Sequence, residues 1–513
     1  MIEPLRCVKS TDVITGWDFS TGAVKCLAFD LEGRPLAEVR LPTDLWTEGG
    51  VSELNLMQLE GQARSSVRAI AARLRELGRL DDWVAGGISA THHSAGRIDA
   101  QRVQVRRAIC WNDQTLAEYH TQGLERLGGQ DRARELIGGP WAIRYSLSHL
   151  VKDETTLGED DWHRTHRMLP HGALSAGFLT GNFDVASVSV AASTGIMDLR
   201  TRQWRREMLE ALQRPDYRRL AWDQLPRIVD QYEAVGPLAS HLADEAEIDA
   251  DRRPLVFPTS DDQQAGLIGG GAVEAGHVAV ILGNSAVVNS AGAEVPQTED
   301  LDVMRLNWGP YLWMRCYNNG AQFLDQIVGG NPDWEMLERE ARACPPGADD
   351  TTLLPFVLPE PSLGIAEPQC RWSPAEPRPP GKRFRASLES LAYLIALGVE
   401  AHQRAGQKVT RISVSGGIAR SDLMCEILAT VLDHPLDRLQ SDEGPALGAA
   451  VTALAAMETN LRCKDGIDTP FTMADAAAVL VKTKAPVGPN AEWSGYYRQG
   501  LQAFKEAVGT PSW

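Results

Sequence analysis

The sequence predicts an α/β protein of at least two domains. Its 513 residues exceed what a single hydrophobic core usually organises. Short apolar runs bounded by turn residues alternate with segments of helical periodicity, a pattern typical of mixed α/β folds. A strand–turn–strand unit near the N-terminus recurs in weaker form at residues 277–293, which indicates an internal duplication.

The first domain is expected to begin with an antiparallel meander. Three strand-like runs at 13–18, 24–30 and 35–41 are separated by short turns, the first of them rich in small and hydroxyl residues. Apolar residues then recur on one face of 56–77, which predicts a helix. Another strand is expected at 84–89, and it runs into the unusual string ATHHSAG.

The second half repeats this alternation of strands and helices. The two strands of the repeat, at 277–293, are joined by the turn GNS. Further along we expect a helix at 384–402 and a strand at 411–415, after which the string GGIARSD opens another helix. The segment GPALGAAVTALAA predicts a helix of small residues that is suited to close packing.

Domain boundaries follow from these elements. A buried strand at 255–257 leads into SDDQQAG, so the main boundary is expected near residue 254, with an N-terminal domain at 12–254 and a C-terminal domain at 255–484. Residues 485–513 are expected to form a C-terminal helix that packs back on the body. Pro-rich tracts at 354–361 and 373–381 are expected to be irregular surface connections.

Composition indicates which kinds of partner the protein binds and in which compartment it is found. A formal net charge of −17 argues against nucleic acid or an anionic membrane as a partner, because both would be repelled. The eight cysteines are scattered without a CxxC pair and are expected to be reduced. No run approaches the roughly 18 apolar residues of a membrane helix, and the N-terminal residues lack the apolar region of a secretory signal. We therefore expect a cytoplasmic protein.

The string DFSTGAVK is a candidate phosphate-binding turn. Backbone N–H groups and hydroxyls in a tight turn after a strand can point at a phosphate, as Ser20, Thr21 and Gly22 would here. Asp18 is a candidate for holding Mg²⁺ through water, and Lys25 would add positive charge. Taken alone, the string is better explained by an ordinary hairpin turn with a capping Asp.

Six segments, in the same order, resemble segments of the FGGY carbohydrate kinases, and of the xylulose kinases in particular. They are DFSTGAVKCLAFDLEGRPLAE, ISATHHSAG, RRAICWNDQT, LPHGALSAGFLTGNFDVASVSVAASTGIMDLRTRQW, SDDQQAG, and VSGGIARSDLMCEILATVLDHPL with GPALGAA. The resemblance extends from about residue 12 to residue 508. It implies two ribonuclease-H-like, actin-like ATPase domains flanking a catalytic cleft.

The activity that the resemblance implies is ATP-dependent phosphorylation of a hydroxyl group of a small sugar, with a ketopentose such as xylulose as the expected substrate. Phosphoryl transfer needs positioning, charge stabilisation and one base, and the resemblance assigns the base to Asp262. Asp261 stays open as an alternative base. Either carboxylate can also cap the helix that follows.

The resemblance also implies the residues that bind sugar. His93 and Gln263 would hydrogen-bond sugar hydroxyls, and Trp111, Asn112 and Asp113 form the WND motif of the sugar side. Alternatives are a satisfied histidine at a strand end, a core tryptophan and a structural Asp113.

The nucleotide side is implied in the same way. Its expected residues are Gly283, Asn284 and Ser285 in a second phosphate turn, and Gly416, Gly417 and Ser421 near the adenosine. The family usually has Thr where Asn284 stands, but Asn tolerates turns and still offers a donor. Further departures are Ser20 where Gly is usual, Ser148 near a place where Lys is frequent, and a loop, LLPFVLPEPSLG, without the usual Gly-Glu-Arg-x-Pro run. Together these departures indicate a divergent subgroup and leave the substrate open.

The expected cofactors are ATP and Mg²⁺, and the expected partner is a small sugar; a homodimer stays open. Glycerol, ribulose, a hexulose and a sugar acid are alternative substrates. A catalytically silent actin-like binding protein is the alternative from another class. The presence of Asp18, Lys25 and Asp262 argues against it, since a binding module needs no base.

Overall fold

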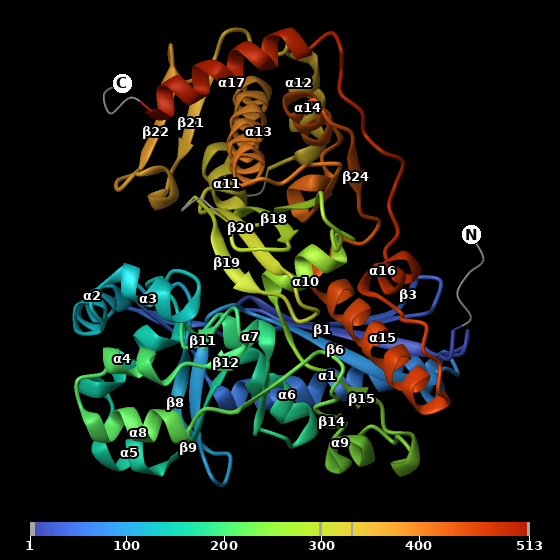
Figure 1. Cartoon of the computed structure of the whole chain (residues 1–513). Helices are drawn as coiled ribbons and strands as arrows, with labels where there is room; N and C mark the ends of the chain where they lie inside the picture. Colours follow the sequence, from blue (N-terminus) through green and yellow to red (C-terminus); the bar gives the residue numbers. More distant parts are fainter. Residues whose placement is uncertain (1–5, 297–299, 330–331, 510–513) are drawn as a thin grey trace.

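The computed structural model describes residues 6–296, 300–329 and 332–509, which form two lobes stacked on one another (Figure 1). Each lobe is built on its own sheet, and helices α10 (Asp262–Gly269) and α15 (Gly444–Asp465) lie between the sheets. The predicted α/β class and the two-domain organisation are confirmed.

The first sheet has the strand order β14-β15-β6-β1-β2-β3, with β16 added beside β6. Its strands are β14 (Gly236–Pro237), β15 (Leu255–Val256), β6 (Trp83–Ala90), β1 (Val13–Phe19), β2 (Ala23–Phe29), β3 (Pro35–Pro42) and β16 (Ser260–Asp261). Strands β1, β2 and β3 form the predicted antiparallel meander, and β6 runs parallel to β1.

The second sheet has the strand order β19-β20-β18-β17-β23-β24. Its strands are β19 (Asp302–Arg305), β20 (Tyr311–Tyr317), β18 (Ala286–Gly292), β17 (His277–Leu282), β23 (Arg411–Ser415) and β24 (Leu436–Arg438). Strand β17 is antiparallel to β18 and parallel to β23, as β1 is to β2 and β6. The two sheets thus share a topology, which agrees with the predicted duplication.

A third sheet, in the order β4-β5-β8-β7-β9, extends the first lobe. It comprises β4 (Trp46–Glu48), β5 (Val51–Leu54), β8 (Gln104–Ile109), β7 (Ala95–Asp99) and β9 (Thr165–Pro170). Smaller pairs are β10 (Val185–Ser187) with β13 (Arg227–Val229), β11 (Met197–Asp198) with β12 (Gln203–Trp204), and β21 (Thr352–Phe356) with β22 (Gln369–Ser373).

Helices cover the outer face of each main sheet. In the first lobe α1 (Leu56–Glu76) packs on β2 and β3, and in the second α13 (Pro380–Arg404) packs on β18 and β20. Further helices of the first lobe are α2 (Leu116–Leu127), α3 (Gln130–Ile137), α4 (Ser146–Thr156), α5 (Glu159–Arg164), α6 (His171–Thr180), α7 (Val188–Ala192), α8 (Pro215–Asp223) and α9 (Ser240–Glu245). The remaining helices are α11 (Ala321–Val328), α12 (Trp334–Ala343), α14 (Asp422–Leu432), α16 (Met473–Leu480) and α17 (Ser494–Gly509).

Helix α15 confirms the predicted close packing of small residues. A Cβ atom on Gly448 would lie 1.8 Å from the carbonyl oxygen of Ala265 in α10, so only glycine fits there. On the other side, a Cβ on Gly16 of β1 would lie 1.8 Å from the carbonyl oxygen of Ala446. These contacts seat a helix from the C-terminal half of the chain directly on the first sheet.

The structure differs from the expected segments at residue 254 and in the tract 354–361, and it defines the C-terminal helix. Residues just beyond 254 form β15 and β16, which pair with β6 of the first sheet, so the chain enters the second sheet only at β17. The tract 354–361, expected to be irregular, begins inside strand β21, because its apolar residues pack in the second core. The predicted C-terminal helix is α17, which packs on α14; residues 510–513 lie outside the described part.

Within the described ranges, none of the helices combines the length and the apolar character needed to cross a bilayer.

Candidate active site

A cavity of about 490 Å³ lies between the two lobes and is lined by residues of both. The predicted site residues on its wall are Ser20, Thr21, His93, Trp111, Asp262, Gln263 and Ser285. These residues come from positions that are far apart in the sequence. The fold therefore brings the first phosphate turn, the substrate segment and the acidic pair into one space.

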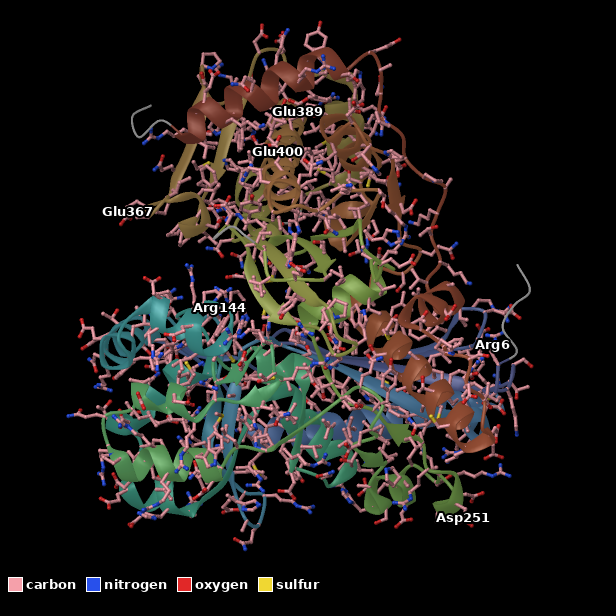
Figure 2. All side chains as sticks on the ribbon, viewed as in Figure 1. Arg6, Arg144, Asp251, Glu367, Glu389 and Glu400 are labelled. Carbon is pink, nitrogen blue, oxygen red and sulfur yellow. The ribbon has the colours of Figure 1, made fainter. Side chains whose placement is uncertain are left out.

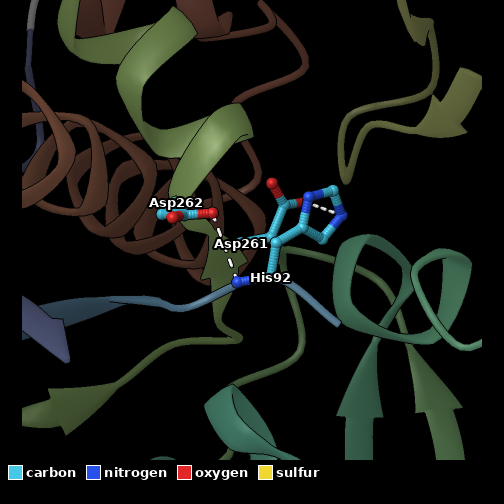
Figure 3. Close-up of side chains that lie close together, drawn as sticks. All are labelled: His92, Asp261 and Asp262. Atoms are coloured by element: carbon cyan, nitrogen blue, oxygen red, sulfur yellow. Dashed lines mark hydrogen bonds and ion pairs between the residues drawn. The ribbon is translucent and has the colours of Figure 1, made fainter. Parts of the chain in front are cut away.

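The two residues of the acidic pair have different positions: Asp261 caps a helix, and Asp262 lines the cavity. Asp261 is the N-cap of α10, and its Oδ1 accepts hydrogen bonds from the backbone N–H groups of Gln263 (3.0 Å) and Gln264 (2.9 Å). Its Oδ2 accepts one from the hydroxyl of Ser189. Asp262 is the first residue of the helix and lines the cavity, where its Oδ1 accepts from the backbone N–H of His92 at 3.3 Å (Figure 3).

The surroundings of Asp262 make its carboxylate a stronger base. Burial raises the pKa of Asp262 well above its ordinary value, and the negative charges of Asp261 and Asp18 raise it further. A carboxylate with a raised pKa has more affinity for the proton of a hydroxyl group. This property is what general-base chemistry needs at this position.

His93 stands on the cavity wall in an unusual backbone conformation. Its φ of 62° is in the left-handed region, which is rare for a residue other than glycine. Its Nδ1 lies 2.9 Å from the carbonyl oxygen of Ser193, so Nδ1 carries the hydrogen and donates it. Burial holds the pKa of His93 well below its usual value, and the neutral ring therefore keeps Nε2 as an acceptor.

The structure separates the three residues of the WND motif. Trp111 is 42% exposed and lines the cavity. Asn112 instead accepts a hydrogen bond from the Ser52 hydroxyl at 2.8 Å. Asp113 is buried, where it accepts from the Ser52 backbone N–H at 3.2 Å and pairs with Lys152 at 3.2 Å. Asn112 and Asp113 are thus not brought to the cavity with the other predicted sugar contacts, and these bonds agree with the structural alternative for Asp113.

The first phosphate turn carries two charged residues that face each other across the strands. Asp18 of β1 is opposite Lys25 of β2, and its Oδ1 accepts from the hydroxyl of Ser89 at 3.0 Å. Burial raises the pKa of Asp18 to about 6. Lys25 forms an ion pair with Glu443, the residue before α15. Gly22 stands in open space at the tip of the turn.

A second cavity, of about 590 Å³, lies in the second lobe. The predicted nucleotide residues on its wall are Gly283, Asn284, Gly417 and Ser421. Gly416 has φ of 93°, and a Cβ there would lie 2.4 Å from the carbonyl oxygen of Leu282, so this turn requires glycine. Ser421 caps α14 and donates to Glu338 at 2.6 Å, so its hydroxyl already has partners.

One turn connects the two cavities. Gly283 and Asn284 line the second cavity, and the next residue, Ser285, lines the first. All three belong to the connection between β17 and β18. A molecule lying along this turn would reach from one cavity to the other.

Sequence reasoning missed the polar residues that complete the first cavity. Arg144 lies at the edge of the first lobe (Figure 2). It forms an ion pair with Asp302 of the second lobe, and both residues line the cavity. Glu360 is buried and accepts from the backbone N–H of Asn318 at 2.7 Å. Arg144 and Asp302 are 158 residues apart, so no local pattern signals their contact.

Two family models match the chain. The N-terminal domain of the FGGY family of carbohydrate kinases matches residues 13–269, and the C-terminal domain of the same family matches residues 364–457. The chain belongs to the FGGY family of carbohydrate kinases. It is accordingly an ATP-dependent sugar kinase.

Individual relatives agree with this assignment. The chain is 27% identical to the xylulose kinase of Escherichia coli over 456 residues, which cover 86% of this chain and 89% of that one. Crystal structures of a gluconate kinase and a ligand-bound xylulose kinase, both from Lactobacillus acidophilus, align with TM-scores of 0.82 and 0.81. Each is 18% identical, and each alignment covers 97% of both chains. These likenesses show the fold and leave the sugar open.

Proposed function

We propose that this kinase phosphorylates a ketopentose such as xylulose, with Asp262 as the general base. The observation that carries the proposal is the carboxyl of Asp262, whose pKa is raised, on the wall of the cavity between the lobes. Asp261 takes over the capping of α10, so Asp262 has no such structural task. The name of the Escherichia coli relative supports xylulose as the first sugar to test.

The sugar would lie in the first cavity with its reactive hydroxyl against Asp262. His93 Nε2 and Gln263 would hydrogen-bond neighbouring hydroxyls, and Trp111 would cover one face of the sugar. As the hydroxyl oxygen bonds to the γ-phosphorus of ATP, Asp262 accepts the hydroxyl proton and the bond to the bridging oxygen breaks. The products are the sugar phosphate and ADP.

The residues of the first phosphate turn fit Mg²⁺ and a triphosphate. Asp18 uses one carboxyl oxygen to accept from Ser89, and burial raises its pKa, so a cation nearby would stabilise its charged form. Mg²⁺ held there would neutralise phosphate charge. Ser20, Thr21 and Gly22 would offer N–H groups and hydroxyls to the phosphates, as would Gly283, Asn284 and Ser285 from the other lobe. Gly416, Gly417 and Ser421 would lie along the nucleoside.

A sugar acid is a less suitable substrate for this cavity, although a gluconate kinase has the same fold. Two arginines line the cavity, but both are already engaged. Arg144 is paired with Asp302, and Arg315 donates to the carbonyl oxygens of Asp300 (2.6 Å) and Ser362. The same wall carries the acidic side chains of Asp262, Asp302 and Glu360, which offer no positive charge to a carboxylate.

A panel of sugars in a coupled assay of ADP release tests the proposal. With ATP and Mg²⁺, D-xylulose should give the highest kcat/KM among D-xylulose, D-ribulose, L-ribulose, glycerol and D-gluconate. A higher value for D-gluconate would contradict the proposed substrate class. ADP release that no sugar stimulates would favour an ATPase or assembly role instead.

A further inference from the structure

We propose that His92 is a substrate-binding residue that selects the configuration at the carbon next to the phosphorylated hydroxyl. This inference rests on the proposed function, because it takes the hydroxyl bound by Asp262 as the reacting one. It gives a role to a side chain for which the sequence analysis had none. It also addresses which of two epimeric ketopentoses the cavity accepts.

The first observation is an unpartnered polar atom. His92 is 5% exposed and lines the cavity, yet its Nε2 has no hydrogen-bond partner. The nearby carboxyl of Asp261 has its Oδ2 3.9 Å from Nε2, which is beyond hydrogen-bond range (Figure 3). A buried polar atom without a partner is costly, and a sugar hydroxyl in the cavity would supply the partner.

The second observation is that the His92 ring is held rigidly. It stacks on the ring of His93 with centroids 3.7 Å apart, and His93 stacks on Tyr145 at 4.5 Å. The backbone of His92 is fixed too, since its N–H donates to Asp262 and its carbonyl oxygen accepts from the N–H of Ser94 at 2.8 Å. The imidazole is therefore positioned relative to the base before any sugar binds.

The third observation is the distance to the base. A ring nitrogen of His92 lies within 4.8 Å of carboxyl oxygens of both Asp261 and Asp262. Neighbouring hydroxyl oxygens on a sugar chain are about one hydrogen-bond length apart, so one can bind Asp262 while the next binds His92. Inverting the carbon that bears the second hydroxyl would point it elsewhere and leave Nε2 unpaired.

The group formed by His92, Asp261 and Asp262 suits a hydroxyl better than a cation. Asp261 already accepts hydrogen bonds from Gln263, Gln264 and Ser189, so few of its lone pairs remain. Burial lowers the pKa of His92, and the neutral ring can exchange a hydrogen bond with an uncharged sugar. A neutral imidazole also avoids adding charge beside the base.

His92→Phe is the test, because phenylalanine keeps a ring to stack on His93 and removes Nε2. D-xylulose and L-ribulose differ only in configuration at C4, next to the terminal hydroxyl. Wild-type protein should prefer D-xylulose, and the variant should lose about tenfold in kcat/KM for D-xylulose and most of the preference. The KM for ATP should stay unchanged. His92→Gln, which keeps a donor and an acceptor, should retain the preference and serves if the Phe variant fails to fold.

Each outcome is decisive. Equal losses for both ketoses in His92→Phe would mean that the ring only supports the wall, and they would overturn the inference. Wild-type protein that uses both ketoses equally would also overturn it, while the proposed function would stand. Wild-type protein that phosphorylates neither ketose would instead contradict the proposed function itself.

Discussion

The two strand–turn–strand units that begin the main sheets have the same topology but differ in their charged side chains. Strands β1 and β2 place Asp18 opposite Lys25 in the unit whose turn lines the first cavity. Strands β17 and β18 carry no ionisable side chain from Val278 to Gly292, and their turn offers only Gly283, Asn284 and Ser285. The same arrangement of strands thus occurs twice, while the charged groups that we propose for phosphoryl transfer lie in the first unit and on α10.

The largest effect is expected at Asp262, where the two lobes meet. Asp262→Asn keeps the size of the side chain but removes its ability to accept the hydroxyl proton. General-base assistance contributes about 100- to 10,000-fold, so kcat should fall by that factor while ATP affinity changes little. Steady-state kinetics with saturating sugar would measure it. An Asp262→Asn variant with near wild-type kcat would remove this residue from the chemistry.

Asp261→Asn is the matched control, and it adds a pH test. The amide oxygen of the Asn can still accept from the N–H groups of Gln263 and Gln264 at the start of α10, so most of the activity should remain. Asp262 must be deprotonated to act, so kcat/KM should fall as the pH drops through its raised pKa. Because the charge of Asp261 contributes to that raised pKa, its removal should move this falling limb to lower pH. A limb that moves to higher pH would contradict the coupling.

The next largest effect is expected on Mg²⁺ binding at Asp18, which belongs to the first phosphate turn and has no acidic counterpart in the second. Asp18→Asn removes the charge that we expect to hold Mg²⁺, and losses of this kind weaken metal binding by about 10- to 100-fold. The Mg²⁺ concentration for half-maximal activity should rise accordingly, while the KM for sugar changes little. Titration of Mg²⁺ at fixed ATP would measure this shift. An unchanged Mg²⁺ requirement would place the metal elsewhere.

The packing of α15 on the first unit should have a smaller effect. Gly16→Ala in β1 would push a Cβ against the backbone of α15, and such overpacking typically costs about 1–3 kcal/mol. Thermal unfolding should show a lower Tm than wild type. Gly22→Ala, in the same unit but facing open space, should leave the Tm almost unchanged. Equal stability of the two variants would argue that α15 moves aside easily.

The smallest effect is expected at Asn284. Asn284→Thr restores the residue that is usual in the family at an exposed turn position, and such changes usually stay within about 0.5 kcal/mol. Both side chains offer a hydrogen-bond donor, and the backbone N–H groups of the turn are kept, so the KM for ATP should shift by only about twofold, in contrast to Asp18→Asn. A large gain in kcat/KM for ATP would show that this departure limits nucleotide binding.

The regular elements were predictable because their signals are local. The meander at 13–41, the helix at 56–77 and the strand at 411–415 agree with the structure to within a few residues. Alternating apolar residues and turn residues encode such elements directly. Helix α15 could also be anticipated, since a run of Gly and Ala is useful only where backbones approach closely.

Much of the cavity wall was not predictable from local patterns. Arg144 and Asp302 meet only because the lobes stack, and Glu360 is buried by contacts that neighbouring residues do not signal. In the WND motif, adjacent residues point in different directions, and only Trp111 reaches the cavity. The motif therefore identified the segment that reaches the cavity, but it could not show which of its side chains line the cavity.

The position of α15 has a consequence for how the chain is made. The apolar face formed by Ile14, Phe29 and Ala85 is covered by residues such as Leu447 and Val451, more than 350 positions later in the sequence. During synthesis on the ribosome, the first sheet therefore emerges long before the helix that covers it. Until then the exposed face is a surface for chaperones or for aggregation. A fragment that ends before Gly444 should consequently express poorly, even though it contains every strand of the first sheet.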